Sequence, residues 1–295
     1  MKIGVIGLGS MGAGAAARLV HAGHDVTGCD TRAGAVQHVV TLGGTAAATP
    51  QALPPGLDAL IVFVVNAAQV EAVLFGPEGC AGQLAAGTVV LLCATVPPAT
   101  ARDVAARLAA SGVLMLDAPV SGGSGAAAAG SMTVMASGSA AAFERAGPVL
   151  DAIAAKVWRL GDEAGAGSTV KMVNQLLAGV HIAAAAEAMA LGIKAGADPQ
   201  TLFDVISVSA GSSWMFQNRV PHILAGDDTP HSTVDIFVKD LGIVLDGGRA
   251  LTIPLPLSAA AHQLFLAVSA LGYGQRDDAF VIRFWEALAG VKLPK

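Results

Sequence analysis

Three polar side chains, Lys171, Asn174 and Gln175, stand near the start of a long apolar segment that ends at Lys194. Spacings of three and four residues place them on one face of a helix, one turn apart. A lysine inside an apolar helix needs partners, and burial can lower its pKa until it exchanges protons near neutral pH. Lys171 is therefore a candidate general acid and base. The alternative is that its side chain extends from the first turn into solvent.

The segment that positions this lysine is predicted to be a helix that begins near residue 168 and ends at residue 194. It is rich in helix-forming residues and contains no proline. Ser168 or Thr169 is expected to cap its first turn, after a flexible glycine-rich lead-in at residues 161–167. Because the helix is apolar on all sides, we expect it to be buried between two domains or between two subunits.

The N-terminal residues predict a cofactor site. An apolar strand over residues 2–6 leads into a glycine-rich loop and a helix over about 11–22, and a second strand over 25–29 ends at Asp30. This order of strand, G-x-G-x-x-G loop, helix, strand and acid is the fingerprint of a dinucleotide-binding Rossmann unit. The loop lets the backbone approach a pyrophosphate at the helix N-terminus. The expected contacts in the loop are Gly7, Leu8, Gly9, Ser10, Met11 and Gly12.

Asp30 bears on the choice of cofactor. Its carboxylate is expected to accept hydrogen bonds from the adenosine ribose and to repel a 2′-phosphate, which favours NAD over NADP. Arg32 leaves NADP as an alternative, since an arginine at this position can pair with the 2′-phosphate. It can equally be a solvated surface charge. We predict NAD.

The sheet is predicted to continue, and its strand ends carry further candidates. Strands are expected over residues 57–65, 88–93, 112–117, 131–136 and 156–160. Ligands bind at the carboxyl ends of strands in open α/β sheets, where Val65 and Thr95 would lie. After Asp117, which is expected to fix the following turn, comes a second glycine-rich loop. The backbone amides of Gly122 and Gly123 and the hydroxyl of Ser121 can hold a substrate carboxylate there.

The second half of the sequence predicts helices and no strands. Segments over residues 199–209, 213–224, 234–250, 257–271 and 277–288 follow the long helix, with proline and glycine clusters between them. The predicted fold is α/β, with a doubly wound N-terminal sheet over residues 1–162 joined by the long helix to an all-helical domain over 163–295. In the 234–250 helix, Lys239 and Asp240 either face solvent or face the cleft between the two domains.

Composition narrows the classes of function. The chain has 295 residues, of which 54% are hydrophobic and 13% are charged, and its net charge is −5 without basic clusters, which argues against nucleic acid as a partner. His181 and Glu187 interrupt the most apolar run, so no membrane span is expected. The three cysteines form no disulfide framework, and no residues have metal-ligand spacing. We expect a soluble cytoplasmic protein that binds no metal.

Taken together, four motifs resemble the β-hydroxyacid dehydrogenase family over essentially the whole chain. They are the glycine loop of residues 7–12, Asp-Ala-Pro-Val-Ser-Gly-Gly at 117–123, Gly-Ser-Thr-Val-Lys-Met-Val-Asn at 167–174 and Lys-Asp-Leu at 239–241. The resemblance implies a homodimer or homotetramer in which Lys171 is the catalytic lysine. It further implies that Asn174 and residues 121–123 bind a small hydroxy acid, and that Val65, Thr95 and Lys239 contact the cofactor.

Residues 64–70, 175–182, 213–216 and 235–241 are similar to the L-threonate dehydrogenase branch of that family. Asn174 stands where that branch has histidine, and Leu92 and Ala94 replace the Asp and Ser that precede Thr95 in the family. The resemblance implies NAD-dependent oxidation of L-threonate to its 2-oxo acid. Oxidation of 3-hydroxyisobutyrate and reduction of tartronate semialdehyde remain alternatives within the family. A non-catalytic NAD-binding sensor or interaction protein is the alternative from another class.

Overall fold

A computed structural model describes residues 1–294, which divide into two compact units, one over residues 1–171 and one from residue 172 onward. The division falls within one long helix, α7 (Ala166–Lys194), so the first turns of that helix belong to the first unit. The predicted fold, an α/β sheet followed by a helical region, is confirmed.

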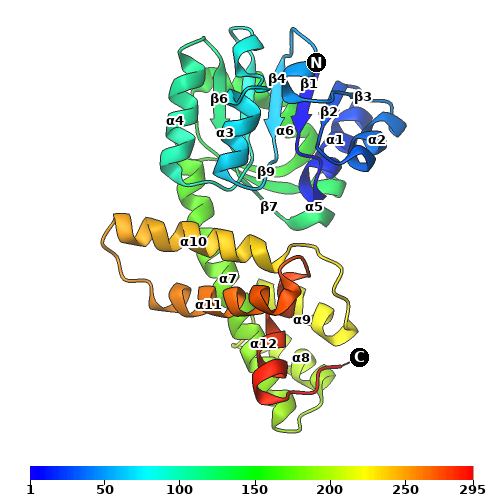
Figure 1. Ribbon diagram of the computed structural model, residues 1–295, viewed down its shortest axis with the longest axis vertical. Coiled ribbons are helices and arrows are strands. Elements are labelled where there is room, and N and C mark those ends of the chain that lie inside the picture. Colours follow the sequence, from blue (N-terminus) through cyan, green and yellow to red (C-terminus); the bar gives the residue numbers. More distant parts are fainter. Residues whose placement is uncertain (295) are drawn as a thin grey trace. The chain divides into compact units, whose positions relative to one another are not determined.

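The first unit is organised around a parallel sheet of six strands in its described residues, in the order β3-β2-β1-β4-β5-β6 (Figure 1). The strand order reverses between β1 and β4, and this reversal is the topological switch point beside which doubly wound folds bind ligands. The strands are β1 (Lys2–Ile6), β2 (Asp25–Cys29), β3 (Thr45–Ala46), β4 (Ala59–Val62), β5 (Val89–Leu92) and β6 (Leu114–Asp117).

Helices cover both faces of this sheet, which explains why its strands are apolar without alternation. Ile61 of β4 packs into one core cluster with α1, α2, α5 and α6, while the adjacent Leu60 packs into the opposite cluster with α3 and α4. The helices of this unit are α1 (Ser10–His21), α2 (Ala33–Thr41), α3 (Ala67–Phe75), α4 (Pro98–Ala109), α5 (Gly123–Ala129) and α6 (Ala140–Ile153), with short 3₁₀ turns at Pro50–Ala52 and Ala81–Gln83.

A smaller sheet follows, in the order β7-β8-β9. It consists of β7 (Val120–Ser121), β8 (Met132–Ala136) and β9 (Ala154–Arg159), and it contains the two closing strands that the sequence predicted. Between β7 and β8 the structure differs from the expectation of a glycine loop alone, because helix α5 begins at Gly123. The alanines at positions 126–129 are strong helix formers, and they continue the chain as a short helix once the glycine turn is made.

The second unit is built from helices in its described residues. They are α8 (Pro199–Ser207), α9 (Trp214–Ala225), α10 (Val234–Ala250), α11 (Pro256–Val268), a π-helical turn at Ser269–Tyr273, a 3₁₀ turn at Asp278–Ile282 and α12 (Arg283–Ala289). Their core includes residues from the C-terminal part of α7, where Ile182 and Met189 pack with Phe237 and Phe265. Gly179 of α7 lets α10 approach closely, because an added Cβ would lie 2.9 Å from the side chain of Leu241.

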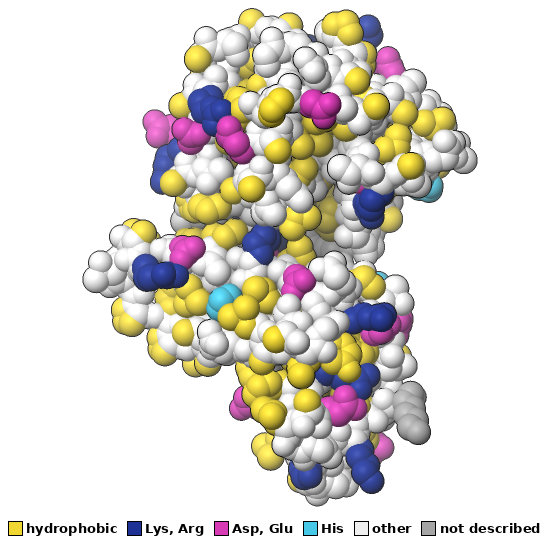
Figure 2. Space-filling model, in the orientation of Figure 1, with side chains coloured by type: hydrophobic (Ala, Val, Ile, Leu, Met, Phe, Trp, Pro, Cys, Tyr) yellow, Lys and Arg dark blue, Asp and Glu magenta, His cyan; other side chains and the backbone are white. Residues whose placement is uncertain are grey.

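Helix α7 is the one described helix that is long and apolar enough to cross a membrane by length and composition alone. In the structure, 39% of its most apolar 18-residue window is buried, and residues 182–190 contribute to the core of the second unit. The core helix of a soluble protein has the same composition. Figure 2 shows charged side chains scattered singly or in small groups among apolar ones on the face that it draws, in keeping with the low charge content of the sequence.

Candidate functional site

The candidate residues of the first unit follow strands that run in the same direction. All six strands of the large sheet are parallel, so their carboxyl ends lie at one edge. Asp30 follows β2, Val65 follows β4 by three residues, and Thr95 follows β5. The loop of residues 7–12 follows β1, and Ser121 to Gly123 come shortly after β6. The structure therefore brings the predicted site residues of this unit to a single edge of the sheet.

The loop between β1 and α1 fits a dinucleotide. Gly9 caps α1 with extended backbone and no side-chain hydrogen bond, so the first amides of the helix are presented by the backbone alone. The loop has no room for side chains at two of its glycines. A Cβ at Gly12 would overlap the carbonyl oxygen of Gly7, and a Cβ at Gly7 would lie 2.8 Å from the carbonyl oxygen of Phe63. A helix N-terminus of this kind attracts a phosphate through its amides and its dipole.

Asp30 connects the end of β2 to this loop. Its Oδ2 accepts a hydrogen bond from the backbone amide of Leu8 at 2.7 Å, and its Oδ1 accepts from the amide of Arg32 at 2.8 Å. The Arg32 guanidinium pairs with the same carboxylate at 3.1 Å and donates to the carbonyl of Leu8 at 2.9 Å. Burial raises the pKa of Asp30, but the hydrogen bonds from Arg32 and Leu8 outweigh it and hold that pKa below its ordinary value. Asp30 is therefore ionised at neutral pH.

A cavity of about 460 Å³ opens beside Asp30. Its other lining residues are apolar or uncharged, and none of the described residues that line it is a lysine or arginine; they are Thr31, Ala33, Val36, Gln37, Val40, Ala46, Ala47 and Ala48. A cavity with one carboxylate and without a cation suits a ribose hydroxyl better than a phosphate.

Asp117, at the end of β6, holds the start of α7. Its Oδ2 accepts hydrogen bonds from the amides of Gly165 and Ser168, both at 2.8 Å, and its Oδ1 accepts from the Ser168 hydroxyl at 2.7 Å. The Ser137 hydroxyl accepts from the amide of Gly167 at 3.0 Å, and Asp117 and Ser137 form a β-bridge. Burial raises the pKa of the Asp117 carboxyl above its ordinary value, although these hydrogen bonds oppose the change.

These contacts correct two expectations. Ser168 does not cap α7, which begins two residues earlier, and its hydroxyl donates to Asp117 instead. Asp117 was expected to fix the turn that follows it, whereas its carboxylate holds the start of α7. The physical reason is that the first amides of the helix lack partners within the helix and are buried, so that a carboxylate from the sheet satisfies them. Lys171, one turn after Ser168, is 7% exposed, so its side chain does not extend into solvent.

Replacement of Asp117 by alanine is expected to lower the free energy of unfolding by roughly 2–5 kcal/mol, because two amides and a hydroxyl lose a buried acceptor. Asp117→Asn is the matched control. Its carbonyl oxygen can accept from both amides while its amide donates to Ser168, so it should stay within about 1 kcal/mol of the wild type. Urea denaturation of the three proteins measures both effects. An alanine variant as stable as the wild type would contradict this role for Asp117.

The Ser121–Gly123 turn requires its glycines. Gly122 has φ of 128° and Gly123 has φ of 70°, both in the region that side chains disfavour, and a Cβ at Gly122 would lie 2.5 Å from the side chain of Ala126. The turn joins β7 to α5, which packs closely on α1, since a Cβ at Gly14 would lie 2.7 Å from the backbone of Ala127. The predicted substrate loop and the predicted cofactor helix are thus in contact through α5.

In the second unit, Asn174 and Lys239 belong to one polar chain. The amide nitrogen of Asn174 donates to Oε1 of Gln175 at 3.0 Å, and the amide nitrogen of Gln175 donates to Oδ2 of Asp240 at 2.5 Å. The Lys239 ammonium pairs with the other oxygen of Asp240 at 2.6 Å. Asp240 is 2% exposed and Gln175 is 8% exposed. The sequence suggested that Lys239 and Asp240 face either solvent or the cleft between the domains. Neither alternative included their hydrogen-bonded connection to Gln175 and Asn174.

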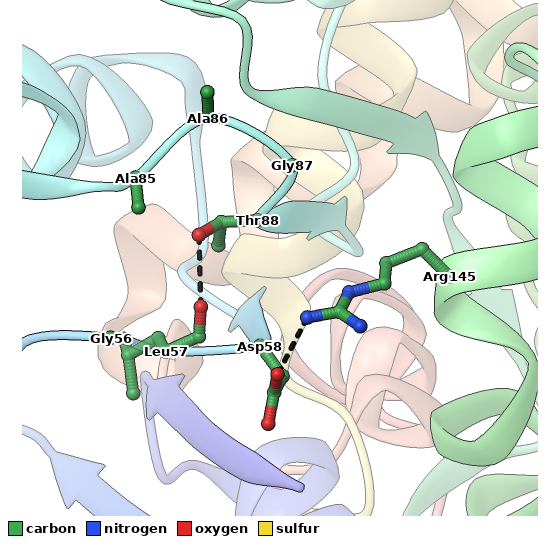
Figure 3. A pocket seen from close by; sticks show the side chains of 8 residues that line it. All are labelled: Gly56, Leu57, Asp58, Ala85, Ala86, Gly87, Thr88 and Arg145. Carbon is green, nitrogen blue, oxygen red and sulfur yellow. Dashed lines mark hydrogen bonds and ion pairs between the residues drawn. The ribbon is translucent and has the colours of Figure 1, made fainter.

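A second cavity, of about 440 Å³, lies at the opposite edge of the sheet (Figure 3). Asp58 and Thr88, which line it, precede β4 and β5, and the Arg145 guanidinium crosses to Asp58 at 2.5 Å. Thr88 donates its hydroxyl to the carbonyl of Leu57 at 2.9 Å. None of the predicted site residues lines this cavity, and its position at the amino ends of the strands separates it from the candidate site.

Sequence reasoning missed Ser137, Gly165 and Gly167 as residues that support the site. Gly167 is required by close packing, since an added Cβ would lie 2.5 Å from the carbonyl oxygen of Asp117. The signal available in the sequence was the glycine pair at 165 and 167, which was interpreted as a flexible lead-in. These glycines allow the first turn of α7 to lie against the sheet.

Comparisons with known proteins find dehydrogenases similar to this chain over almost its whole length. Residues 2–161 match the family model for the NAD binding domain of 6-phosphogluconate dehydrogenase. Residues 165–285 match the model for the NAD-binding region of NADP-dependent 3-hydroxyisobutyrate dehydrogenase. The L-threonate dehydrogenase of Cupriavidus necator is 57% identical over 99% of this chain and 98% of its own length. That of Escherichia coli is 52% identical over 99% and 96%.

Among solved structures, the crystal structure of 3-hydroxyisobutyrate dehydrogenase from Salmonella typhimurium superposes with a TM-score of 0.92. The two sequences are 51% identical, and the match covers 96% of this chain and 99% of that one. The similarity therefore includes both the sheet and the helices.

Proposed function

Because the chain belongs to the β-hydroxyacid dehydrogenase family, whose members transfer a hydride between a hydroxy acid and NAD(P), we propose that it oxidises L-threonate to the 2-oxo acid. The observation that carries this proposal is the full-length identity of 57% and 52% to two L-threonate dehydrogenases. Oxidation of 3-hydroxyisobutyrate is the second candidate, since the similar Salmonella structure bears that name. Reduction of tartronate semialdehyde is a third.

Lys171 is the proposed general base. In the oxidative direction its amine takes the proton of the C2 hydroxyl as the C–O bond becomes a carbonyl. NAD, when bound, would supply the acceptor for the hydride that leaves the same carbon. In the reverse direction the ammonium returns the proton and stabilises charge that develops on the carbonyl oxygen. Its low exposure and its place one turn from the residues that Asp117 holds support this role, because the amine is then fixed rather than mobile.

The Ser121–Gly123 turn is the proposed site for the substrate carboxylate. Its proposed donors are the backbone amides of Gly122 and Gly123, both at positive φ, and the Ser121 hydroxyl. An anion held there would orient the carbinol carbon for hydride transfer, which is catalysis by positioning. Asn174, one turn after Lys171 on α7, is proposed to orient the amine and the hydroxyl.

NAD is the proposed cofactor, bound by residues 7–12 and Asp30 with further contacts from Val65, Thr95 and Lys239. The Asp30 carboxylate favours NAD because it is ionised and because the neighbouring cation Arg32 already pairs with it. A 2′-phosphate would have to displace that pairing and approach a carboxylate.

Asp30→Asn is therefore expected to shift the ratio of kcat/KM for NAD+ over NADP+ toward NADP+ by roughly 10- to 100-fold. The asparagine oxygen can still accept from the amide of Leu8, while the charge is removed and Arg32 loses its ionic partner. Asp25→Asn, at the other end of β2, is the control and should leave the ratio unchanged. An unaltered ratio in the Asp30 variant would mean that another group sets the preference.

A panel of small hydroxy acids, assayed for formation of NADH and NADPH, tests the proposed reaction. L-threonate should give the highest kcat/KM, and 3-hydroxyisobutyrate and glycerate should follow. A higher value for 3-hydroxyisobutyrate would replace the proposed substrate with the second candidate. NADH binding without turnover of any member would favour the non-catalytic NAD-binding protein.

We further propose a cytoplasmic homo-oligomer that forms through the helical unit. Apolar side chains of α11 and of the segment between α10 and α11 are exposed in the single chain, among them Leu251 (66%), Ile253 (54%) and Leu257 (70%). The three cysteines are buried and free, as is usual in a reducing compartment. Light scattering coupled to size-exclusion chromatography measures the number of subunits.

A further inference from the structure

In the polar chain of the second unit, each hydrogen bond has its donor on the same side, so the row of side chains runs in one direction. Asp240, when ionised, has only acceptors, so the side-chain amide that faces it must present its nitrogen. Gln175 therefore turns its Nε2 to Asp240, and its Oε1 turns to Asn174. Asn174 must in turn present its Nδ2 to Gln175, which directs its own oxygen, Oδ1, away from the chain. One carboxylate thus decides the orientation of two successive amides.

The orientation of a side-chain amide is otherwise free, since its oxygen and its nitrogen differ little in shape. Burial makes the orientation of the Gln175 amide energetically important. Asp240 and Gln175 are almost inaccessible to water, so no water could satisfy a reversed amide. Lys239 contributes by pairing with Oδ1 of Asp240, which leaves Oδ2 for Gln175. The two oxygens of the carboxylate are thereby assigned to two different partners.

We propose that Asp240 is a positioning residue that acts through Gln175 to make Asn174 present an acceptor, its Oδ1, to the reacting groups. This inference rests on the proposed function, in which Lys171 takes a proton from the substrate hydroxyl. An acceptor beside that amine can receive one of its N–H groups, which turns the nitrogen lone pair toward the hydroxyl, and it stabilises the ammonium once the proton has moved. A donor at the same place would oppose the ammonium.

The test is Asp240→Asn, which keeps the shape of the side chain and is expected to exchange the donors and acceptors along the polar chain. The Lys239 ammonium will attract the new oxygen, so the new Nδ2 faces Gln175. Gln175 must then present its oxygen to residue 240 and its nitrogen to Asn174, whose Nδ2 then faces the reacting groups. We expect kcat to fall roughly 10- to 100-fold while the Kd of NADH changes by less than about twofold.

Asp204→Asn is the matched control, because Gln200 donates its Nε2 to Asp204 at 2.8 Å in an exposed pair on α8. It should leave kcat and KM unchanged. A double-mutant cycle with Asn174→Ala tests the route. If Asp240 acts through Asn174, Asp240→Asn will lower kcat by less than about twofold in a chain that already lacks the Asn174 side chain. The same loss in both backgrounds would overturn the proposal.

Neutron diffraction provides a measurement that does not depend on turnover. In the wild type, the amide deuterons of Gln175 should face Asp240 and those of Asn174 should face Gln175, and Asp240→Asn should reverse both. Unchanged orientations in the variant would overturn the inference. The expected reversal in a protein that does not oxidise L-threonate would instead remove the proposed substrate and leave the role of Asp240 standing.

Discussion

Replacement of Lys171 by alanine is expected to lower kcat by roughly 10²- to 10⁴-fold, the contribution usual for a positioned acid or base, while NADH still binds. Lys171 is 7% exposed and lies on the helix whose start Asp117 fixes to the sheet. Its removal therefore takes away the group proposed to accept the hydroxyl proton and leaves the glycine loop of residues 7–12 intact. Steady-state kinetics with L-threonate and fluorescence titration with NADH measure the two quantities separately.

Two further lysine variants make this result specific. Lys171→Arg keeps a positive charge but does not release a proton near neutral pH, so it should remain nearly as inactive as the alanine variant. Lys194→Ala removes a lysine from the other end of the same helix, where the ammonium donates to the carbonyl of Ala289 at 2.8 Å, and it should keep normal turnover. Turnover near the wild-type value in Lys171→Ala would exclude this amine as the base.

Gly12→Ala is expected to raise the Kd of NADH at least about 100-fold. The added methyl group would overlap the carbonyl oxygen of Gly7 and lie 3.2 Å from the side chain of Phe63, so the loop must move away from the helix N-terminus that it shapes. A displaced loop no longer presents its amides to a pyrophosphate, and the contacts to phosphate are charge-assisted hydrogen bonds of about 1.5–3 kcal/mol each. Equilibrium titration with NADH measures the loss.

Gly34→Ala provides the comparison for this glycine. Gly34 lies in α2, and nothing lies within 4 Å of the position that its Cβ would take, so the substitution should leave NADH binding unchanged and stabilise the helix slightly. Unaltered thermal stability in Gly12→Ala together with weak binding would assign the effect to the loop. Wild-type affinity in that variant would contradict the proposed phosphate site.

The cofactor unit was predictable from the sequence because each of its signals is local. The apolar strand, the glycines at 7, 9 and 12 and the acid at 30 act on their own neighbours in the chain, and β1, α1 and β2 were predicted within about a residue of their observed ends. Four of the later strands were predicted too long; residues 57–65, for example, contain a strand only over Ala59–Val62. The last predicted strand, 156–160, instead begins two residues earlier, at Ala154. An apolar run continues into buried loop residues, so it does not mark where hydrogen bonding between strands ends.

Lys171 and the Ser121–Gly123 turn were singled out from residue types and resemblance, and their roles stay predictions. What the sequence determined by itself is the set of chemical groups and the local turns that expose them. The tertiary structure decided their partners, because Asp117 reaches Ser168 across 51 residues of chain and Gln175 reaches Asp240 across 65. A buried hydrogen bond joins whichever groups the packing of β6, α7 and α10 brings together, and no spacing along the sequence encodes that distance.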